Sequence, residues 1–364
     1  MGARVTGART PRASVARVVL PCPLVAERQG KPVDDETWMR RALDAALAAR
    51  RRSSPNPWVG CVIVARDGRA VDGATEPPGG RHAEIVALHE AERLGIDPTG
   101  ATVYTTLEPC SHHGRTPPCT DALVAAGVTR VVAAIGDPDD NVNGSGLATL
   151  RAAGIVTTVG VSADAATEQL RPYLHHRRTG RPFVVLKLAA TLDGRTAAAD
   201  GSSRWITGED ARREVHRLRS ESDAIVVGAG TVRADDPSLD VRLVDGPSPR
   251  RVVLGRAPTD ARVHPCLEWD GDLGGLLDHL GGEGVLQVLV EGGATVAGKF
   301  HRAGLVDRYV VHLAPAFAGG DDGRPLFGGP GIATISDLRR GRLVSTRILG
   351  DDLEIVVEPP NATR

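Results

Sequence analysis

Three side chains in the first half of the chain have the types and spacing of a zinc site. His82 stands at the start of a predicted helix, and Cys110 and Cys119 flank a loop rich in proline and histidine. A hydrolytic zinc site takes three protein ligands and leaves the fourth tetrahedral position for water. Glu84, two residues after His82, could take the proton from that water and pass it to a departing amine. The pattern therefore predicts zinc-assisted hydrolysis with Glu84 as the catalytic residue.

A structural zinc site is the alternative interpretation, because structural sites usually close with a fourth protein ligand. His112 or His113, between the two cysteines, could be that ligand. Cys61 lies in a predicted strand, where a small core residue is expected. Cys22 and Cys266 have no partner at metal spacing, and we assign them no role. Because five cysteines in a long chain form no dense disulfide framework, we expect a reducing compartment, the cytoplasm.

The spacing of the two cysteines indicates which kind of zinc protein this is. Zinc deaminases carry His-x-Glu followed by Pro-Cys-x-x-Cys, but here eight residues separate the cysteines. This longer segment, Pro-Cys-Ser-His-His-Gly-Arg-Thr-Pro-Pro-Cys at residues 109–119, resembles the deaminase half of the bifunctional deaminase–reductases of riboflavin biosynthesis. Asn56-Pro57-Trp58-Val59-Gly60 is similar to the start of that family's substrate-binding strand, which implies that Asn56 contacts substrate. The resemblance covers about residues 35–160.

A second group of motifs occupies the other half of the chain. Lys187 stands in a predicted strand, Trp205-Ile-Thr-Gly leads into a helix that bears Arg212, His216 and Arg219, and Glu291-Gly-Gly passes from a strand into a helix pattern. Glycines at such a junction let the backbone approach a phosphate, whose charge a helix N-terminus favours. The chain has no G-x-G-x-x-G fingerprint, which disfavours a Rossmann dinucleotide fold.

Together these segments, from about residue 182 to 358, resemble the reductase half of the same family, which is similar in fold to dihydrofolate reductase. The resemblance implies NADPH as hydride donor and a pyrimidine ribosyl phosphate as substrate. It implies that the cofactor contacts Ala189, Trp205, Thr231, Asp235, Gly293, Ala294, Thr295, Val296, Ala297, Gly298 and Lys299. It implies that the substrate contacts Ser203, Arg219, Leu239, Arg242 and Glu291, and that Lys187 orients substrate or cofactor.

The chemistry of these residue types fits that assignment in part. Arg219 and Arg242 suit a ribose phosphate, which needs guanidinium partners. Lys187 has a plainer interpretation as an ordinary lysine at the end of a strand. Glu291 could pair with polar groups of the sugar or could cap the glycine turn.

The elements that must position these residues alternate between strand and helix patterns. We expect a disordered extension over residues 1–33, with a basic targeting peptide as the alternative for its first 26 residues. A cytidine-deaminase-like, layered and largely parallel α/β domain should cover 34–178, and a dihydrofolate-reductase-like α/β domain should cover 179–364. The boundary falls in a basic, turn-rich segment at 177–182. Strands are predicted at 59–65, 102–107, 131–135, 155–159, 183–188, 224–227, 251–254, 285–290, 309–313 and 353–357, and helices at 83–94, 120–126 and 209–220.

Length and composition agree with two domains and narrow the function classes. The chain has 364 residues, of which 41% are hydrophobic and 24% charged, so a disordered chain is excluded. No run of 18 apolar residues occurs, so no membrane partner is expected. A net charge of −1 and an aromatic content of 3% argue against a nucleic-acid partner. A homo-oligomer remains open.

The predicted function is two consecutive reactions of riboflavin biosynthesis. By the resemblance, zinc-dependent deamination of 2,5-diamino-6-ribosylamino-4(3H)-pyrimidinone 5′-phosphate precedes NADPH-dependent reduction to 5-amino-6-ribitylamino-uracil 5′-phosphate. Two rival hypotheses are a nucleic-acid base deaminase with an accessory domain and a folate-type reductase with a structural zinc module. The long segment between the cysteines and the second group of motifs argue against the first. The acid beside His82 argues against the second.

Overall fold

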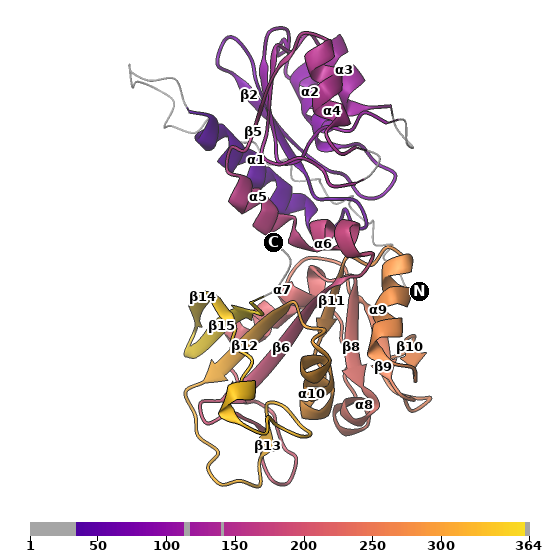
Figure 1. The fold of residues 1–364 in the computed structure, drawn as a ribbon, viewed down its shortest axis with the longest axis vertical. Coiled ribbons are helices and arrows are strands. Elements are labelled where there is room, and N and C mark those ends of the chain that lie inside the picture. Colours follow the sequence, from indigo (N-terminus) through magenta and orange to yellow (C-terminus); the bar gives the residue numbers. More distant parts are fainter. Residues whose placement is uncertain (1–33, 113–116, 140–141, 361–364) are drawn as a thin grey trace, which may run out of the picture. The chain divides into compact units, whose positions relative to one another are not determined.

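A computed structural model describes residues 34–112, 117–139 and 142–360 (Figure 1). The predicted extension over 1–33, with Cys22, and the candidate fourth ligand His113 lie outside the described residues. The predicted fold class, two successive α/β domains, agrees with two main sheets, one of five strands and one of eight. No helix among the described residues is both long and apolar enough to cross a membrane.

The first sheet has the strand order β2-β1-β3-β4-β5 and is mixed. β1 is antiparallel to β2 and β3, whereas β3, β4 and β5 are parallel. The prediction of a largely parallel sheet was therefore wrong for one side of this sheet. Residues 65–69 join β1 to β2 in a tight turn, which is too short for the crossover that parallel neighbours require. The strands are β1 Gly60–Val64, β2 Ala70–Ala74, β3 Thr102–Thr105, β4 Arg130–Ala133 and β5 Val156–Val159.

Helices cover both faces of this sheet. Successive strand residues point to opposite faces, and here both sets are apolar, so each face packs against helices. Cys61 and Ile63 pack in the core with alanines of α2 and leucines of α3 and α4, whereas Val62 packs with α1 and α5. Figure 1 shows α2, α3 and α4 together on one side of the strands. The helices are α1 Asp35–Ala49, α2 Ala83–Arg93, α3 Cys119–Ala125, α4 Ser145–Ala152, α5 Ala163–Gln169 and α6 Arg171–Thr179.

The second sheet has the order β10-β9-β8-β11-β6-β12-β15-β14, parallel from β10 to β12 and antiparallel at β15 and β14. Apolar residues of α9 and α10 pack on one face and those of α7 on the other. Strands β7 and β13 form a separate pair. The elements are β6 Phe183–Thr191, β7 Arg195–Ala197, α7 Glu209–Ser220, β8 Ala224–Gly228, α8 Ala229–Asp235, β9 Arg250–Leu254, β10 Leu267–Trp269, α9 Leu273–Gly282, β11 Gln287–Val290, α10 Ala294–Ala303, β12 Arg308–Ala314, β13 Arg324–Pro325, β14 Arg342–Leu349 and β15 Asp352–Glu358, with a 3-10 turn at Ile335–Asp337.

The segment predicted as a turn-rich joint at 177–182 is helical in its first part. α6 continues through Thr179 and ends at Gly180, whose φ of 71° is the left-handed conformation that stops helices. The Gly180 N–H donates to the His176 carbonyl and completes this C-cap. The joint between the predicted domains is therefore a capped helix end that two residues, Arg181 and Pro182, connect to β6.

Substitutions at two adjacent glycines of α9 would show how closely this helix packs on the chain that leads into β6. A Cβ on Gly281 would lie 2.0 Å from the Gly180 carbonyl oxygen, whereas a Cβ on Gly282 would meet nothing within 4 Å. We expect Gly281→Ala to lower the free energy of unfolding by about 1–3 kcal/mol through overpacking. Gly282→Ala should leave it unchanged or raise it by up to about 1 kcal/mol. Equal urea midpoints for the two variants would contradict this close approach.

Candidate metal centre and reductase site

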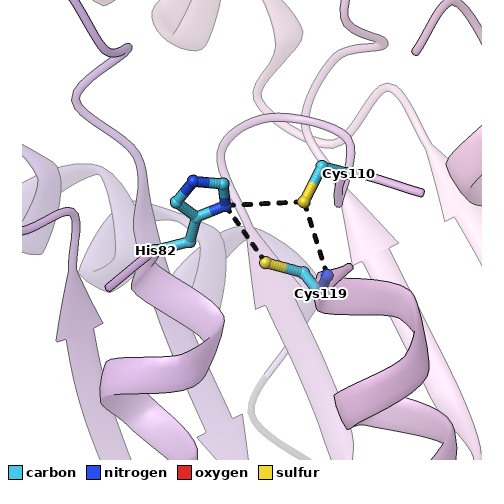
Figure 2. A group of neighbouring side chains, drawn as sticks. All are labelled: His82, Cys110 and Cys119. Atoms are coloured by element: carbon cyan, nitrogen blue, oxygen red, sulfur yellow. Dashed lines mark hydrogen bonds between the residues drawn. The ribbon is translucent and has the colours of Figure 1, made fainter. Parts of the chain in front are cut away.

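The side chains of His82, Cys110 and Cys119 converge at one point, although they come from three separate segments (Figure 2). Nδ1 of His82 lies 3.5 Å from Sγ of Cys110 and 3.3 Å from Sγ of Cys119. Around a tetrahedral zinc ion with ordinary bond lengths, a nitrogen and a sulfur ligand lie about 3.6 Å apart. The three donors are thus spaced for one zinc ion, and both residue types are preferred zinc ligands.

Two helix starts and one loop build this group. His82 is the N-cap of α2, and Cys119 is the first residue of α3, directly after Pro118, whose φ is −56°. Cys110 lies in the loop between β3 and α3, and the Cys119 N–H donates to its Sγ at 3.4 Å. Because a helix N-terminus favours negative charge, this arrangement stabilises a thiolate at Cys110.

The titration of the two thiols agrees with a metal centre. A hydrogen bond from the thiol of Cys119 lowers the pKa of Cys110 to about 4. The same hydrogen bond, together with burial, raises the pKa of Cys119. Zinc takes thiolates as ligands, so a zinc ion held by this pair would require the loss of the Cys119 proton.

Glu84 lies beside the metal ligands and is only 3% exposed. It belongs to the first turn of α2, and the Thr105 hydroxyl at the end of β3 donates to its Oε1 at 3.4 Å. Burial raises the pKa of Glu84. A carboxyl group with a raised pKa can both accept and deliver a proton near neutral pH, as general acid–base catalysis requires.

The structure also locates the other residues considered around the zinc site. His112 is exposed and does not join the ligand cluster, which among the described residues holds three donors only. Cys61 is fully buried in β1, as expected of a core residue. Cys266 lies 3.5 Å from Nδ1 of His264, far along the chain from the metal ligands. Asn56 is partly exposed in the turn before β1.

In the second half of the chain, three charged residues predicted to meet substrate lie together. Arg219 of α7 forms two hydrogen bonds of 2.7 Å with the Glu291 carboxylate at the end of β11. Burial lowers the pKa of Lys187 in β6, and the Glu291 charge opposes this effect. Although burial acts against ionisation, the Arg219 charge lowers the pKa of Glu291. One carboxylate that is mostly removed from solvent is therefore bound by Arg219 and attracted by the charge of Lys187.

Arg242 is held differently from Arg219. Its guanidinium is about half exposed and pairs with Asp240, and its backbone N–H donates to Nδ1 of His216 at 3.2 Å. Leu239, in the same loop, is buried with a φ of 52°. His216 was not predicted as a site residue. Its position three residues before Arg219 on α7 places both side chains on one face of the helix, and this spacing could have indicated it.

The predicted cofactor residues fall into two groups. The first consists of Ala189, Trp205 and Asp235, which lie before α9, and the second lies at the start of α10. Trp205 is 69% exposed, with the Arg212 guanidinium 4.6 Å from its ring, and Arg204 donates to the Asp235 carbonyl. Ala189 lies in β6 opposite His312 of β12. Ser203, which was predicted to contact substrate, lies in the loop before Trp205.

The other group surrounds the start of α10. Gly293 is the N-cap of α10, and its Cβ position lies 3.5 Å from Oγ1 of Thr231. Ala294 and Thr295 follow in the first turn of that helix. A Cβ on Gly292 would lie 2.4 Å from the Val296 side chain, so glycine is required for this tight junction. Lys299 is exposed, whereas the three residues before it face the core: Val296, Ala297 and Gly298.

Comparisons with known proteins match both halves of the chain. Residues 32–135 match the family model described as the cytidine and deoxycytidylate deaminase zinc-binding region, and residues 182–355 match the RibD C-terminal domain. The chain is similar to the riboflavin biosynthesis protein RibD of Mycobacterium tuberculosis (strain ATCC 25618 / H37Rv), with 42% identity over 89% of this chain and 97% of the relative. The corresponding protein of Escherichia coli (strain K12) is 40% identical over 88% of this chain and 98% of its own length.

Solved structures give the same result at the level of the fold. RibD of Acinetobacter baumannii, form 1, has a TM-score of 0.82 with 36% identity, covering 90% of this chain and 99% of its own. A Thermotoga maritima protein described as a diaminohydroxyphosphoribosylaminopyrimidine deaminase/5-amino-6-(5-phosphoribosylamino)uracil reductase has a TM-score of 0.84 with 32% identity, covering 89% and 98%. The predicted family and fold class are confirmed. This chain, with a zinc-binding deaminase region before a reductase domain, belongs to the RibD family of bifunctional enzymes of riboflavin biosynthesis.

Proposed function

We propose that this chain deaminates 2,5-diamino-6-ribosylamino-4(3H)-pyrimidinone 5′-phosphate and then reduces the product to 5-amino-6-ribitylamino-uracil 5′-phosphate. The observation that carries the proposal is the group of three zinc-type donors with a buried carboxyl beside it, in a chain that also has a RibD reductase domain. A nucleic-acid base deaminase and a folate-type reductase both fit this pairing poorly. The substrate is a small molecule, and no nucleic-acid partner is proposed.

In the deaminase half, His82, Cys110 and Cys119 would hold zinc, which when bound supplies an acidified water. Glu84 takes the proton from the attacking water and delivers it to the amine nitrogen. A C–O bond forms at the amine-bearing ring carbon, the C–N bond breaks, and ammonia leaves. The second proton of the water passes to the adjacent ring nitrogen, so that a carbonyl group remains on that carbon. The raised pKa of Glu84 supports this role, because the same carboxyl must gain and then lose a proton in each turnover.

In the reductase half, NADPH supplies a hydride to C1′ of the ribosyl group. The ring C–O bond opens, and its oxygen takes a proton, which leaves an open ribityl chain. We assign Lys187 and Glu291 to orientation of the sugar, because both are mostly removed from solvent and Glu291 follows β11 directly beside the part of β6 that carries Lys187. The N-terminus of α10, beside Gly293 and Thr231, suits a phosphate of the cofactor.

We assign Arg242, rather than Arg219, as the main partner of the substrate phosphate. Both Arg219 and Arg242 were predicted to contact substrate, but two nitrogens of Arg219 already bind Glu291. Arg242 is more exposed and has one carboxylate partner, Asp240. Arg219 then fixes Glu291, and Arg242 is left to pair with the phosphate.

We further propose the boundaries 34–178 and 179–364 for the two catalytic domains and a cytoplasmic location. Separate family matches over 32–135 and 182–355 support the division. Free cysteines support a reducing compartment: Cys61, Cys110, Cys119 and Cys266. A homo-oligomer is supported by the number of large apolar side chains that are exposed within residues 317–348, namely Phe317, Ile332, Ile335, Leu338, Leu343 and Ile348.

The metal assignment is tested by exchanging sulfur for oxygen. Cys110→Ser and Cys119→Ser should each lose most of the bound zinc after dialysis, because serine is a poor zinc ligand at neutral pH. Cys266→Ser, outside the cluster, should keep the wild-type zinc content and serves as the control. Zinc measured by mass spectrometry at one ion per chain in the double variant Cys110→Ser/Cys119→Ser would overturn the assignment.

Glu84→Gln tests the proton transfer. The amide preserves the shape of the side chain but carries no exchangeable acid, so ammonia release should fall by about 10²–10⁴-fold while zinc is retained. Glu92→Gln, on an exposed position of the same helix, should release ammonia at the wild-type rate. Reduction of substrate that has already been deaminated should be unaffected in both variants. Wild-type ammonia release from Glu84→Gln would show that Glu84 is structural.

Arg242→Ala tests the phosphate assignment. Loss of a charge-assisted contact should raise the KM for the deaminated substrate by about 10-fold or more. The kcat and the affinity for NADPH should not change. Arg213→Ala, on the exposed side of α7, removes an equal charge and should change neither constant. An unchanged KM in Arg242→Ala would move the phosphate contact to another residue.

A further inference from the structure

Glu108 is a buried carboxylate for which the proposed reaction has no use. It is 4% exposed and stands two residues before the zinc ligand Cys110. None of its hydrogen bonds reaches a metal ligand. Its partners instead come from the chain that runs from the end of β4 into the first turn of α4, about 30 to 40 residues further along the sequence.

Three backbone N–H groups donate to this carboxylate. Oε2 accepts from Asp137 at 3.3 Å and from Gly144 at 3.1 Å, and Oε1 accepts from Leu147 at 3.0 Å. Leu147 belongs to the first turn of α4, where a negative charge is favoured. Both oxygens are therefore used as acceptors, which a carboxylate can satisfy and a primary amide cannot.

The neighbours of Glu108 in the sequence bind the same part of the chain. A Cβ on Gly146 would lie 1.9 Å from the Pro109 carbonyl oxygen, so the start of α4 lies directly against Pro109. The hydroxyls of Ser111 and Ser145 are 2.6 Å apart. Contacts with the start of α4 thus precede and follow Cys110, while its sulfur is directed to His82 and Cys119 (Figure 2).

We infer that Glu108 is a positioning residue for the metal centre, which fixes the backbone that carries Cys110 against the start of α4. This inference rests on the proposed zinc site and adds a residue that acts through a ligand. Outer contacts that orient ligands typically change metal affinity by about 10–100-fold when they are removed. Glu108 would act on the thiolate through the backbone, by restricting where Sγ can lie.

The test compares Glu108→Gln with a variant that weakens the same sheet elsewhere. In Glu108→Gln at least one backbone N–H faces an amide NH2, whereas most contacts and the side-chain volume are kept. Asp35→Asn is the matched control, because Asp35 binds Arg130 and the Tyr104 hydroxyl on the face of the sheet opposite α2 and α3. Both variants lose one carboxylate that is bound by hydrogen bonds.

Zinc release to a chelator and the absorption spectrum of the cobalt(II)-substituted protein are the readouts. We expect Glu108→Gln to release zinc about 10–100-fold faster than wild type and to alter the sulfur-to-cobalt absorption. Asp35→Asn should lower the urea midpoint but leave both readouts unchanged. Wild-type release and spectrum in Glu108→Gln would overturn the inference, and so would equal acceleration in Asp35→Asn.

A second variant covers the case in which Glu108→Gln does not fold. Tyr173→Phe removes the hydroxyl that donates to both oxygens of Asp137, at 3.1 Å each, and so loosens the same segment without touching Glu108. It should accelerate zinc release by a smaller factor, and no acceleration would count against the inference. A wild-type protein that binds no zinc would instead refute the proposed metal site itself, so the two failures are distinguishable.

Discussion

The deaminase half depends on one constraint, namely that the sulfur atoms of Cys110 and Cys119 must lie 3.5 and 3.3 Å from the same imidazole nitrogen of His82. Thiolates repel one another, and burying them is unfavourable without compensating groups. The fold supplies the compensation at the starts of α2 and α3, whose N–H groups favour negative charge. A backbone N–H of α3 donates directly to the Cys110 sulfur. The positions of these two helices on the sheet therefore decide whether the three donors can share one metal ion.

Packing around this point leaves little freedom. Gly73, in β2, would place a Cβ 2.1 Å from the Ala83 carbonyl oxygen, so β2 and the first turn of α2 approach as closely as their backbones permit. The same turn carries Glu84, whose raised pKa follows from this close packing. A site that was more open to water would hold the carboxyl ionised and less suited to exchanging protons. The tight packing at the first turn of α2 and the raised pKa of Glu84 are thus two consequences of one arrangement.

The reductase half solves a different electrostatic problem. Glu291 would be unfavourable as a single buried charge, but Arg219 binds both of its oxygens and Lys187 adds a second positive charge nearby. Removing one partner from such a group leaves the others uncompensated, so the three residues act as a unit. This arrangement holds polar groups in fixed directions, which suits a reaction whose hydride comes from a cofactor.

Much of this protein could be predicted from its sequence. The residue types around Cys110 and Cys119 indicated zinc chemistry and a family, because ligand identity and spacing are local properties. The periodicity of α7 also predicted its bounds, Glu209–Ser220. The prediction of a turn-rich joint at 177–182 was wrong in its first part. The arginines there are the last turn of α6, and the helix ends only at Gly180, where a left-handed φ stops it.

Tertiary structure alone decided the contacts between residues far apart in the sequence. Arg219 and Glu291 were predicted separately as substrate residues, and only the fold brings them together across 72 positions. Glu108 gives no periodic signal in a proline-rich loop, and its three donors become neighbours only when β4 and α4 are in place. Which atoms can bind zinc could be predicted from the residue types, because ligand strength is a property of the individual side chain. The structure decided which buried charges are paired, because pairing depends on distances that only the packed elements define.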